Sequence, residues 1–107
     1  MDAPTPNAAL DEEGYLIEPE DWSEDLARDL AAREGLELSS SHWEALCFMR
    51  AYYAEHRVVP DARFVIKHLS RRLQGDRNLL FRLFPYGYVR QACKIAGMKR
   101  PRAWSTG

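Results

Sequence analysis

Cys93 is the residue of this chain best suited to covalent chemistry. It lies between Arg90 and Lys94, and its sulfur acts as a nucleophile once it is a thiolate. The neighbouring cations favour the thiolate, whereas the negative C-terminal end of the helix predicted around Cys93 opposes it. The sequence therefore leaves the direction of its pKa shift open. Cys93 is a candidate redox residue or nucleophile, and the alternative is a small apolar residue packed inside.

Cys47 and His42 are weaker candidates. Cys47 follows Trp43 by one helical turn on the apolar stripe of a predicted helix, so we expect it to be buried. His42 begins the same helix, where we expect a first-turn polar residue, with a catalytic role as the alternative. The two cysteines lie 46 positions apart without clustered His or Cys, which fits neither a zinc site nor a disulfide scaffold. We therefore predict no metal site and no cofactor.

Cationic side chains in the second half of the chain are the candidates for binding a partner. They are Arg63, Lys67, Arg90, Lys94, Lys99 and Arg100. Each of them can equally be ordinary solvated surface. Trp104, near the end of the sequence, is a bulky amphipathic side chain that suits an aromatic anchor for a partner or a plug for a groove, and a disordered position is the alternative.

Capping and stop signals place the first two helices. Ser23 is a suitable N-cap and Gly35 a left-handed stop, which predicts a helix over about 24–34. A second helix begins after Ser39 and ends before Pro60. Its broad apolar stripe, which we expect to cross the core, consists of Trp43, Leu46, Cys47, Met49, Tyr52 and Tyr53.

Three further helices are predicted in the basic half of the chain. Asp61 caps one that ends near Gly75, a short one covers about 77–83, and a fifth follows Gly87 over about 88–96. On the third helix we expect Phe64, Val65 and Leu69 to face inward and Arg63, Lys67, Arg71 and Arg72 to face outward. On the fifth, one face holds Val89, Ala92, Cys93 and Ala96.

The N-terminal segment is expected to differ from the rest. Residues 1–13 lack apolar periodicity, so we expect them to be disordered, and 14–17 is a β-prone piece suited to one arm of a small hairpin. The sequence thus predicts an all-α orthogonal bundle of about five helices, with a small N-terminal β-hairpin and a flexible C-terminal arm.

Composition sets broad limits on the class of protein. A chain of 107 residues with 46% apolar content suits a single domain, and a monomer is the default expectation. No apolar run is long enough for a membrane span and no signal segment is recognisable, so we expect a cytoplasmic protein. Residues 1–37 hold twelve acids against two arginines, while 57–107 hold twelve Lys or Arg against two acids. This asymmetry either pairs the halves within the fold or presents a basic face to an acidic protein or nucleic acid.

An ordered set of short motifs resembles the TusE/DsrC family of sulfur-relay proteins over roughly residues 14–104. The set comprises Asp21-Trp22-Ser23, Glu34-Gly35-Leu36-Glu37-Leu38-Ser39, His42-Trp43-Glu44, Arg50-Ala51-Tyr52-Tyr53, Pro60, Arg63, Lys67, Leu83-Phe84-Pro85-Tyr86-Gly87 and Arg90-Gln91-Ala92-Cys93-Lys94-Ile95-Ala96-Gly97. The resemblance implies a helical domain over 14–97 and an arm over 98–107. It also implies partners of two kinds, a TusBCD/DsrEFH-type sulfurtransferase or a sulfite reductase.

The same resemblance points to one departure from the family. In the family, a cysteine near the tip of the arm carries sulfur as a persulfide, and here that position holds Trp104. DsrC members have a second cysteine at the position of Cys93 that pairs with the arm cysteine. TusE members, which pass sulfur toward tRNA thiolation, usually have the arm cysteine alone. This chain has neither arrangement.

Three hypotheses follow from the sequence. The leading one is a sulfur-relay paralogue that docks the family's partners without carrying sulfur itself. The second is a sulfur carrier or sulfurtransferase subunit that uses Cys93. The third is a nucleic-acid-binding regulator, because the basic helices after Asp61 loosely resemble a helix-turn-helix and their binding would weaken with salt.

Overall fold

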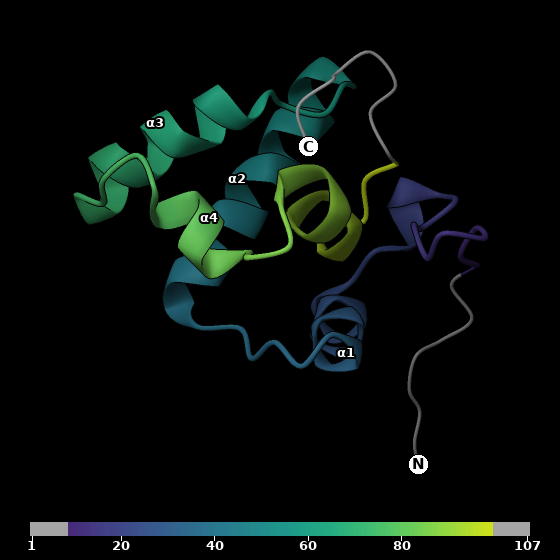
Figure 1. The fold of residues 1–107 in the computed structure, drawn as a ribbon. Coiled ribbons are helices and arrows are strands. Elements are labelled where there is room, and N and C mark those ends of the chain that lie inside the picture. Colours follow the sequence, from purple (N-terminus) through teal and green to yellow (C-terminus); the bar gives the residue numbers. More distant parts are fainter. Residues whose placement is uncertain (1–8, 100–107) are drawn as a thin grey trace.

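The helices of the chain are arranged around α2, the longest of them. The computed structural model describes residues 9–99. In chain order the elements are the 3-10 turn η1 (Pro19–Asp21), α1 (Glu24–Arg33), α2 (Ser40–His56), α3 (Ala62–Leu73), α4 (Leu79–Leu83) and the π-helix η2 (Tyr88–Cys93). Figure 1 shows α2 running through the middle, with α1 on one side of it and α3 and α4 on the other. The predicted helical class with about five helices is confirmed for these residues.

Side chains cap α1 and α3 as the sequence predicts. Ser23 accepts a hydrogen bond from the amide of Leu26 (3.1 Å) at the start of α1, and Asp61 accepts one from the amide of Arg63 (2.9 Å) at the start of α3. At Gly35, just beyond α1, φ is +71°. These local signals fix where the helices begin and end because each supplies a partner or a conformation that the helix interior cannot.

The fifth helix differs from the prediction in kind. An α-helix was expected over 88–96, but the first six residues form the π-helix η2, and the Gly87 carbonyl accepts bonds from the amides of Gln91 (3.0 Å) and Ala92 (3.4 Å). The wider turn directs five of six side chains inward. They are Tyr88, Val89, Gln91, Ala92 and Cys93.

The predicted N-terminal β-hairpin is wrong. The described residues hold no strand, and the only pairing there is a single antiparallel bridge between Leu10 and Leu16. The Asp11 carboxylate accepts the amides of Glu13 and Tyr15, both at 2.9 Å, and so folds the chain back after one pair. Of the segment expected to be disordered, the structure describes Ala9 onward. The boundaries 1–13, 14–97 and 98–107 stay predictions.

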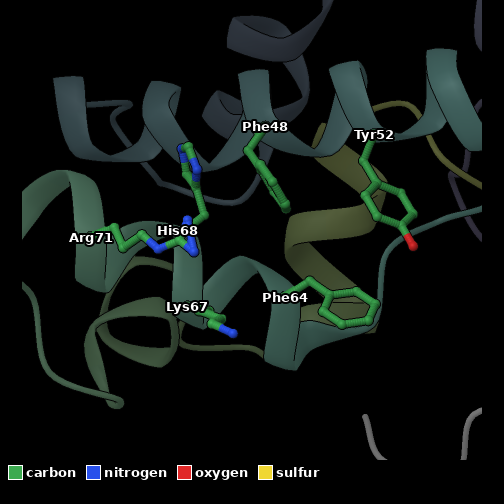
Figure 2. Close-up of a pocket in the computed structure, with 6 residues that line it drawn as sticks. All are labelled: Phe48, Tyr52, Phe64, Lys67, His68 and Arg71. Atoms are coloured by element: carbon green, nitrogen blue, oxygen red, sulfur yellow. The ribbon is translucent and has the colours of Figure 1, made fainter.

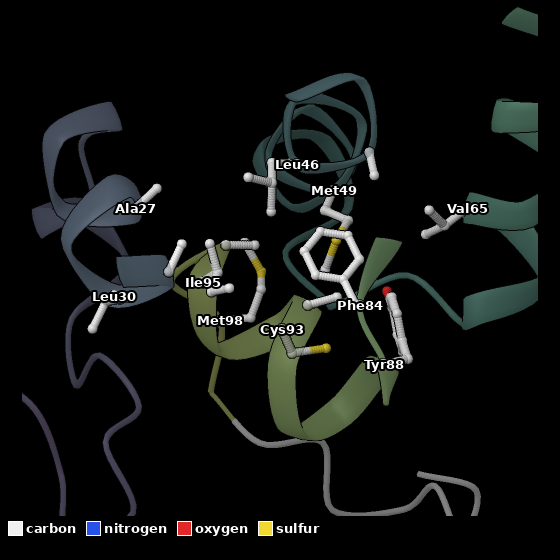
Figure 3. Close-up of a cluster of buried hydrophobic side chains, with 14 of the residues drawn as sticks. Ala27, Leu30, Leu46, Met49, Val65, Phe84, Tyr88, Cys93, Ile95 and Met98 are labelled. Carbon is white, nitrogen blue, oxygen red and sulfur yellow. The ribbon is translucent and has the colours of Figure 1, made fainter. Parts of the chain in front are cut away.

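The core gathers on the face where η2 meets α1 and α2. Figure 3 shows Ile95 and Met98 between Ala27 of α1 and Leu46 of α2. Met98 is completely buried, so the chain is still part of the core at the start of the predicted arm. Residues 100–107 of that arm lie outside the described residues. Among helices of residues 9–99, none combines the length and the apolar character that crossing a bilayer requires.

Two side chains expected to face inward do not. Cys47 is exposed, and Phe64 on α3 is 46% exposed. The buried face of α2 runs through Ala45, Leu46 and Met49. Cys47 lies about 100° around the helix from Leu46, because α-helical residues advance by that angle, and so it falls off this face. The buried face of α2 is therefore narrower than the apolar stripe predicted from its sequence.

Candidate functional site

The thiol of Cys93 lies inside the protein. Its side chain is 0% exposed, and Figure 3 shows its sulfur directed toward Tyr88 rather than toward solvent. Burial raises the pKa of the Cys93 thiol to about 12, and the hydroxyl of Tyr88 offsets only part of that rise. At neutral pH, Cys93 is therefore a protonated thiol, which is the poorly nucleophilic form. The sequence left the direction of the pKa shift of Cys93 open, and burial makes it an upward shift.

Two tyrosines attach η2, the element that carries Cys93, to other parts of the chain. Tyr88 donates its hydroxyl to the carbonyl of Pro60 (2.6 Å), and Tyr15 donates its hydroxyl to the carbonyl of Val89 (2.9 Å). Both side chains are buried. These bonds fasten η2 to the N-terminal segment and to the loop before α3.

A buried polar group beside Cys93 was not predicted. Gln91 is 1% exposed; its amide nitrogen donates to Glu34 Oε1 (2.8 Å), and its amide oxygen accepts the backbone N–H of Tyr86 (3.1 Å). Lys94 Nζ lies 3.9 Å from Glu34 Oε2. Glu34 thus connects the end of α1 to η2. A polar residue within an otherwise apolar helical face was the available signal for this contact.

The predicted partner-binding cations that the structure describes lie at more than one place on the surface. Arg63 and Lys67 are exposed on α3, and the nearest carboxylate to Arg63 is that of its own cap, Asp61 (3.1 Å). Arg90 and Lys94 line a separate hollow of about 240 Å³ at the N-terminal segment. Lys99 is exposed, while Arg100 and Trp104 lie outside the described residues. A partner-binding role for any of the six stays a prediction.

Lys94 is the least free of these cations. Its ammonium lies 5.2 Å from the centroid of the Tyr15 ring, in addition to its contact with Glu34. Its side chain is only 23% exposed. Lys94 therefore contributes to the attachment of η2, and Arg90 is the more available of the pair.

His42 has a structural role in the described part of the chain. Its Nδ1 accepts the amide of Ser39 (2.9 Å), so the neutral ring carries its proton on Nε2, which donates to the carbonyl of Leu83 (2.8 Å). Burial lowers the pKa of His42, and the bond to Leu83 offsets part of the shift. The ring joins the start of α2 to the end of α4. This geometry supports the first-turn interpretation rather than the catalytic one.

Arg50 and Trp22 hold the residues that follow η2 from the other side. Arg50 donates to the carbonyls of Ala96 (3.1 Å) and Pro19 (2.9 Å), and its guanidinium lies 4.7 Å from the centroid of the Trp22 ring. Trp22 in turn donates its indole N–H to the carbonyl of Ile95 (2.9 Å). These bonds hold the backbone of Ile95 and Ala96 in place, directly before the predicted arm. Within residues 9–99, no three His, Cys, Asp or Glu side chains gather as metal ligands would.

Comparison with known proteins identifies the family. The family model described as "DsrC like protein" matches residues 4–103, nearly the whole chain. The chain belongs to the DsrC-like family. The resemblance to TusE and DsrC sulfur-relay proteins is thereby confirmed.

Relatives of this DsrC-like protein include several bacterial sulfurtransferases. "Sulfurtransferase TusE" of Sodalis glossinidius is 43% identical over 96 residues, covering 87% of this chain and 89% of the relative. The protein of the same name in Salmonella typhimurium is 45% identical over 96 residues, covering 87% and 88%. The similarity therefore spans nearly the full length of each protein.

Solved structures of DsrC proteins share the fold of this DsrC-like protein. The oxidised γ-subunit of the dissimilatory sulfite reductase from Archaeoglobus fulgidus superimposes with a TM-score of 0.82 at 34% identity, covering 92% of each chain. The solution structure of Allochromatium vinosum DsrC gives a TM-score of 0.81 at 35% identity, covering 98% of this chain and 96% of that one. The arrangement of helices around α2 is thus that of the family.

Proposed function

We propose that this chain is a docking member of the sulfur-relay family, one that binds a sulfurtransferase or sulfite-reductase partner but does not carry sulfur itself. The observation that carries the proposal is the state of Cys93. Its thiol is fully buried, with a pKa raised to about 12. A sulfur carrier needs an accessible thiolate, and this one is neither accessible nor ionised at neutral pH.

The sequence of the predicted arm supports the same conclusion. Residues 94–107 contain no cysteine, and Trp104 stands where the family resemblance places the sulfur-carrying residue. The remaining thiol, Cys47, lies on the exposed side of α2, but partial desolvation of its sulfur and the nearby Glu24 and Glu44 raise its pKa. Cys47 is therefore also poorly suited to accept sulfur.

The partner classes come from the relatives and the neighbours in structure. The curated relatives are named sulfurtransferases, and the Archaeoglobus fulgidus protein is described as a subunit of a dissimilatory sulfite reductase. A helical domain of the same fold can present the same docking surface without the chemistry. On this proposal the protein acts in the cytoplasm, as a competitor or a regulator of a sulfur-carrying relative, in tRNA thiolation or in dissimilatory sulfur metabolism.

The test is intact mass after exposure to a small-molecule persulfide, in a Cys47→Ser background that removes the exposed thiol. In a productive transfer the protein thiolate attacks the outer sulfur of the donor, the donor S–S bond breaks, and the donor leaves as a thiolate. We expect no gain of a sulfur atom with Cys93 alone. The added Trp104→Cys substitution should restore the gain of one sulfur.

Two controls separate the competing outcomes. A one-sulfur gain that disappears when Cys93→Ser is added would show that Cys93 is a carrier and would overturn the proposal. Docking is tested separately, by measuring binding of the unmodified chain to a purified TusBCD-type sulfurtransferase and to a sulfite reductase. Binding to neither would remove the docking part of the proposal.

A further inference from the structure

An aromatic groove with a cationic rim lies between α2 and α3, away from Cys93. Its six lining residues are Phe48, Tyr52, Phe64, Lys67, His68 and Arg71, around a volume of about 280 Å³. Figure 2 shows Phe48 and Tyr52 directed from α2 toward α3, with Phe64 and Lys67 below them. The residues on α2 are four apart and those on α3 are three or four apart, so each helix contributes one continuous face.

The aromatic rings of the groove are held in place by one another. Phe48 stacks on His68 with centroids 4.4 Å apart, and Tyr52 stacks on Phe64 with centroids 5.8 Å apart. His68 is also fixed by Glu44, whose carboxylate lies 2.8 Å from its Nε2. The floor of the groove is therefore preorganised, which lowers the cost of binding.

The groove leaves apolar surface in contact with water. Phe64 is 46% exposed, whereas Val65 and Leu69 on the same helix are buried. An exposed apolar patch with a polar rim marks an interaction site more often than an isolated exposed side chain does. The volume suits the apolar side chains of a partner segment.

The charge at the rim indicates what kind of segment fits. Lys67 and Arg71 have no ion-pair partner among residues 9–99, whereas Arg72 beside them is paired with Glu44 (3.1 Å). Two unpaired cations next to an aromatic floor complement a segment that carries apolar and acidic side chains together.

A nucleic acid fits the same surface less well. Glu44 lies at one end of the groove, bonded to His68, and Glu55 follows Tyr52 by three residues along α2. Affinity for a phosphate backbone grows with the number of Lys and Arg side chains that neutralise it, and the groove offers only two.

We propose that the groove between α2 and α3 docks an acidic amphipathic segment of a partner protein, with apolar side chains on Phe48, Tyr52 and Phe64 and carboxylates on Lys67 and Arg71. The inference deepens the proposed function and rests on it for the identity of the partner. The chemistry of the segment is argued from the groove alone, so it is testable without that partner.

The first experiment uses a short synthetic peptide with leucines at helical spacing and glutamates between them. Amide chemical-shift mapping on the full chain should place the peptide on α2 and α3, and the same peptide with lysines in place of glutamates should bind at least about tenfold more weakly. An oligothymidine of similar length is the nucleic-acid probe. Stronger binding of oligothymidine at the same residues, or peptide shifts confined to other elements, would overturn the proposal.

Matched variants test the groove residues. Phe64→Ser should weaken peptide binding by about tenfold or more, as truncation of a central interface residue does. Phe81→Ser is its control, because Phe81 on α4 is 43% exposed and does not line the groove. Lys67→Glu with Arg71→Glu should abolish binding, whereas Arg77→Glu with Arg82→Glu changes the net charge equally and should leave it intact.

The same variants applied to a purified partner separate this inference from the proposed function. If the sulfurtransferase or the sulfite reductase binds the unmodified chain and Phe64→Ser reduces that binding, both stand. If neither Phe64→Ser nor the Lys67→Glu, Arg71→Glu pair changes partner binding, the partner does not dock in the groove. The proposed docking function then stands, and the inference about the groove does not. If the peptide binds in the groove but neither partner binds the chain, the proposed docking function is wrong and the groove remains a peptide-binding site.

Discussion

The two cysteines of this chain differ in access, because Cys93 is buried and Cys47 is exposed. With a pKa of about 12, Cys93 has a thiolate fraction of roughly one in ten thousand at pH 8, and its sulfur is buried. We therefore expect iodoacetamide to modify Cys47 first in the native protein and Cys93 only through unfolding. Peptide mass spectrometry over a time course measures both rates, and urea should make them similar. Rapid native modification of Cys93 in a Cys47→Ser variant would contradict the buried site.

Two glycines with nearly the same backbone conformation should differ in their tolerance of a side chain. Gly35 (φ +71°) has open space where a Cβ would lie, whereas a Cβ on Gly97 (φ +76°) would lie 2.5 Å from Cδ1 of Trp22. Gly35→Ala should cost about 1 kcal/mol of unfolding free energy, from the left-handed conformation alone. Gly97→Ala should cost about 3 kcal/mol, because overpacking against the ring adds to that strain. Urea unfolding of both variants measures the difference, and equal costs would show that Trp22 yields easily.

Prediction from the sequence was strongest for single residues whose role is local. The caps Ser23 and Asp61 act through their own helix, so the sequence alone identifies them. Cys93 was identified as the central thiol, but its ionisation depends on Tyr88 and on packing from distant parts of the chain. The contact between Gln91 and Glu34 joins residues far apart in sequence, and no local pattern specifies it.

At the scale of elements, α2 is joined to α4 through a histidine that folds in its neutral form. Nδ1 of His42 accepts the Ser39 amide, so a proton on that nitrogen would face another N–H, and burial already lowers its pKa. Because the unfolded state binds this proton more readily, stability should be full above about pH 6.5 and should fall as the pH drops toward the folded-state pKa.

The test compares unfolding free energies between pH 5 and 7.5 for the native chain and for His42→Gln. The variant should lose part of the decline at low pH, since its side chain does not titrate. His56→Gln is the control, because His56 lies at the exposed end of α2. An unchanged pH dependence in His42→Gln would mean that the histidine does not contribute to the linkage.

The type and width of elements were harder to predict than their existence. The helix after Gly87 was expected, but six residues of sequence do not distinguish α from π hydrogen bonding, which depends on how η2 packs. The apolar pattern of α2 and α3 likewise includes Tyr52 and Phe64, which line an open groove. Apolar periodicity indicates a helix face suited to burial. It does not reveal whether another element of the same chain packs on that face.

In the whole molecule, the N-terminal segment and the last described residues form one unit although they lie at opposite ends of the sequence. Figure 1 shows the purple N-terminal segment beside the yellow end of the described chain. Tyr15 and Trp22 bond carbonyls of the C-terminal segment, and Lys94 returns to the ring of Tyr15. Hydrogen bonds to backbone carbonyls make most of this attachment, and the Lys94–Glu34 ion pair (3.9 Å) adds to it. The role of the opposite charges of the two halves therefore stays open between internal pairing and a partner.

Arg50 is the side chain on which this attachment most depends. Its planar guanidinium bridges the carbonyls of Pro19 and Ala96, and a lysine keeps the charge without the fork that makes both bonds. Arg50→Lys should therefore cost about 1–2 kcal/mol of unfolding free energy, since one buried carbonyl loses its donor. Hydrogen exchange should also accelerate at the amides of Gly97 and Met98.

Arg28→Lys is the matched control, because Arg28 lies 5.1 Å from the centroid of the Trp43 ring yet bonds no backbone carbonyl. It should leave exchange at Gly97 and Met98 unchanged. If Arg50→Lys accelerates exchange at these amides with little loss of global stability, the end of η2 opens locally, and the point from which the predicted arm departs is set by Arg50. Equal exchange at the Gly97 and Met98 amides in both variants would mean that the burial of Met98 holds these residues without Arg50. The start of the predicted arm would then be fixed by packing instead of hydrogen bonds.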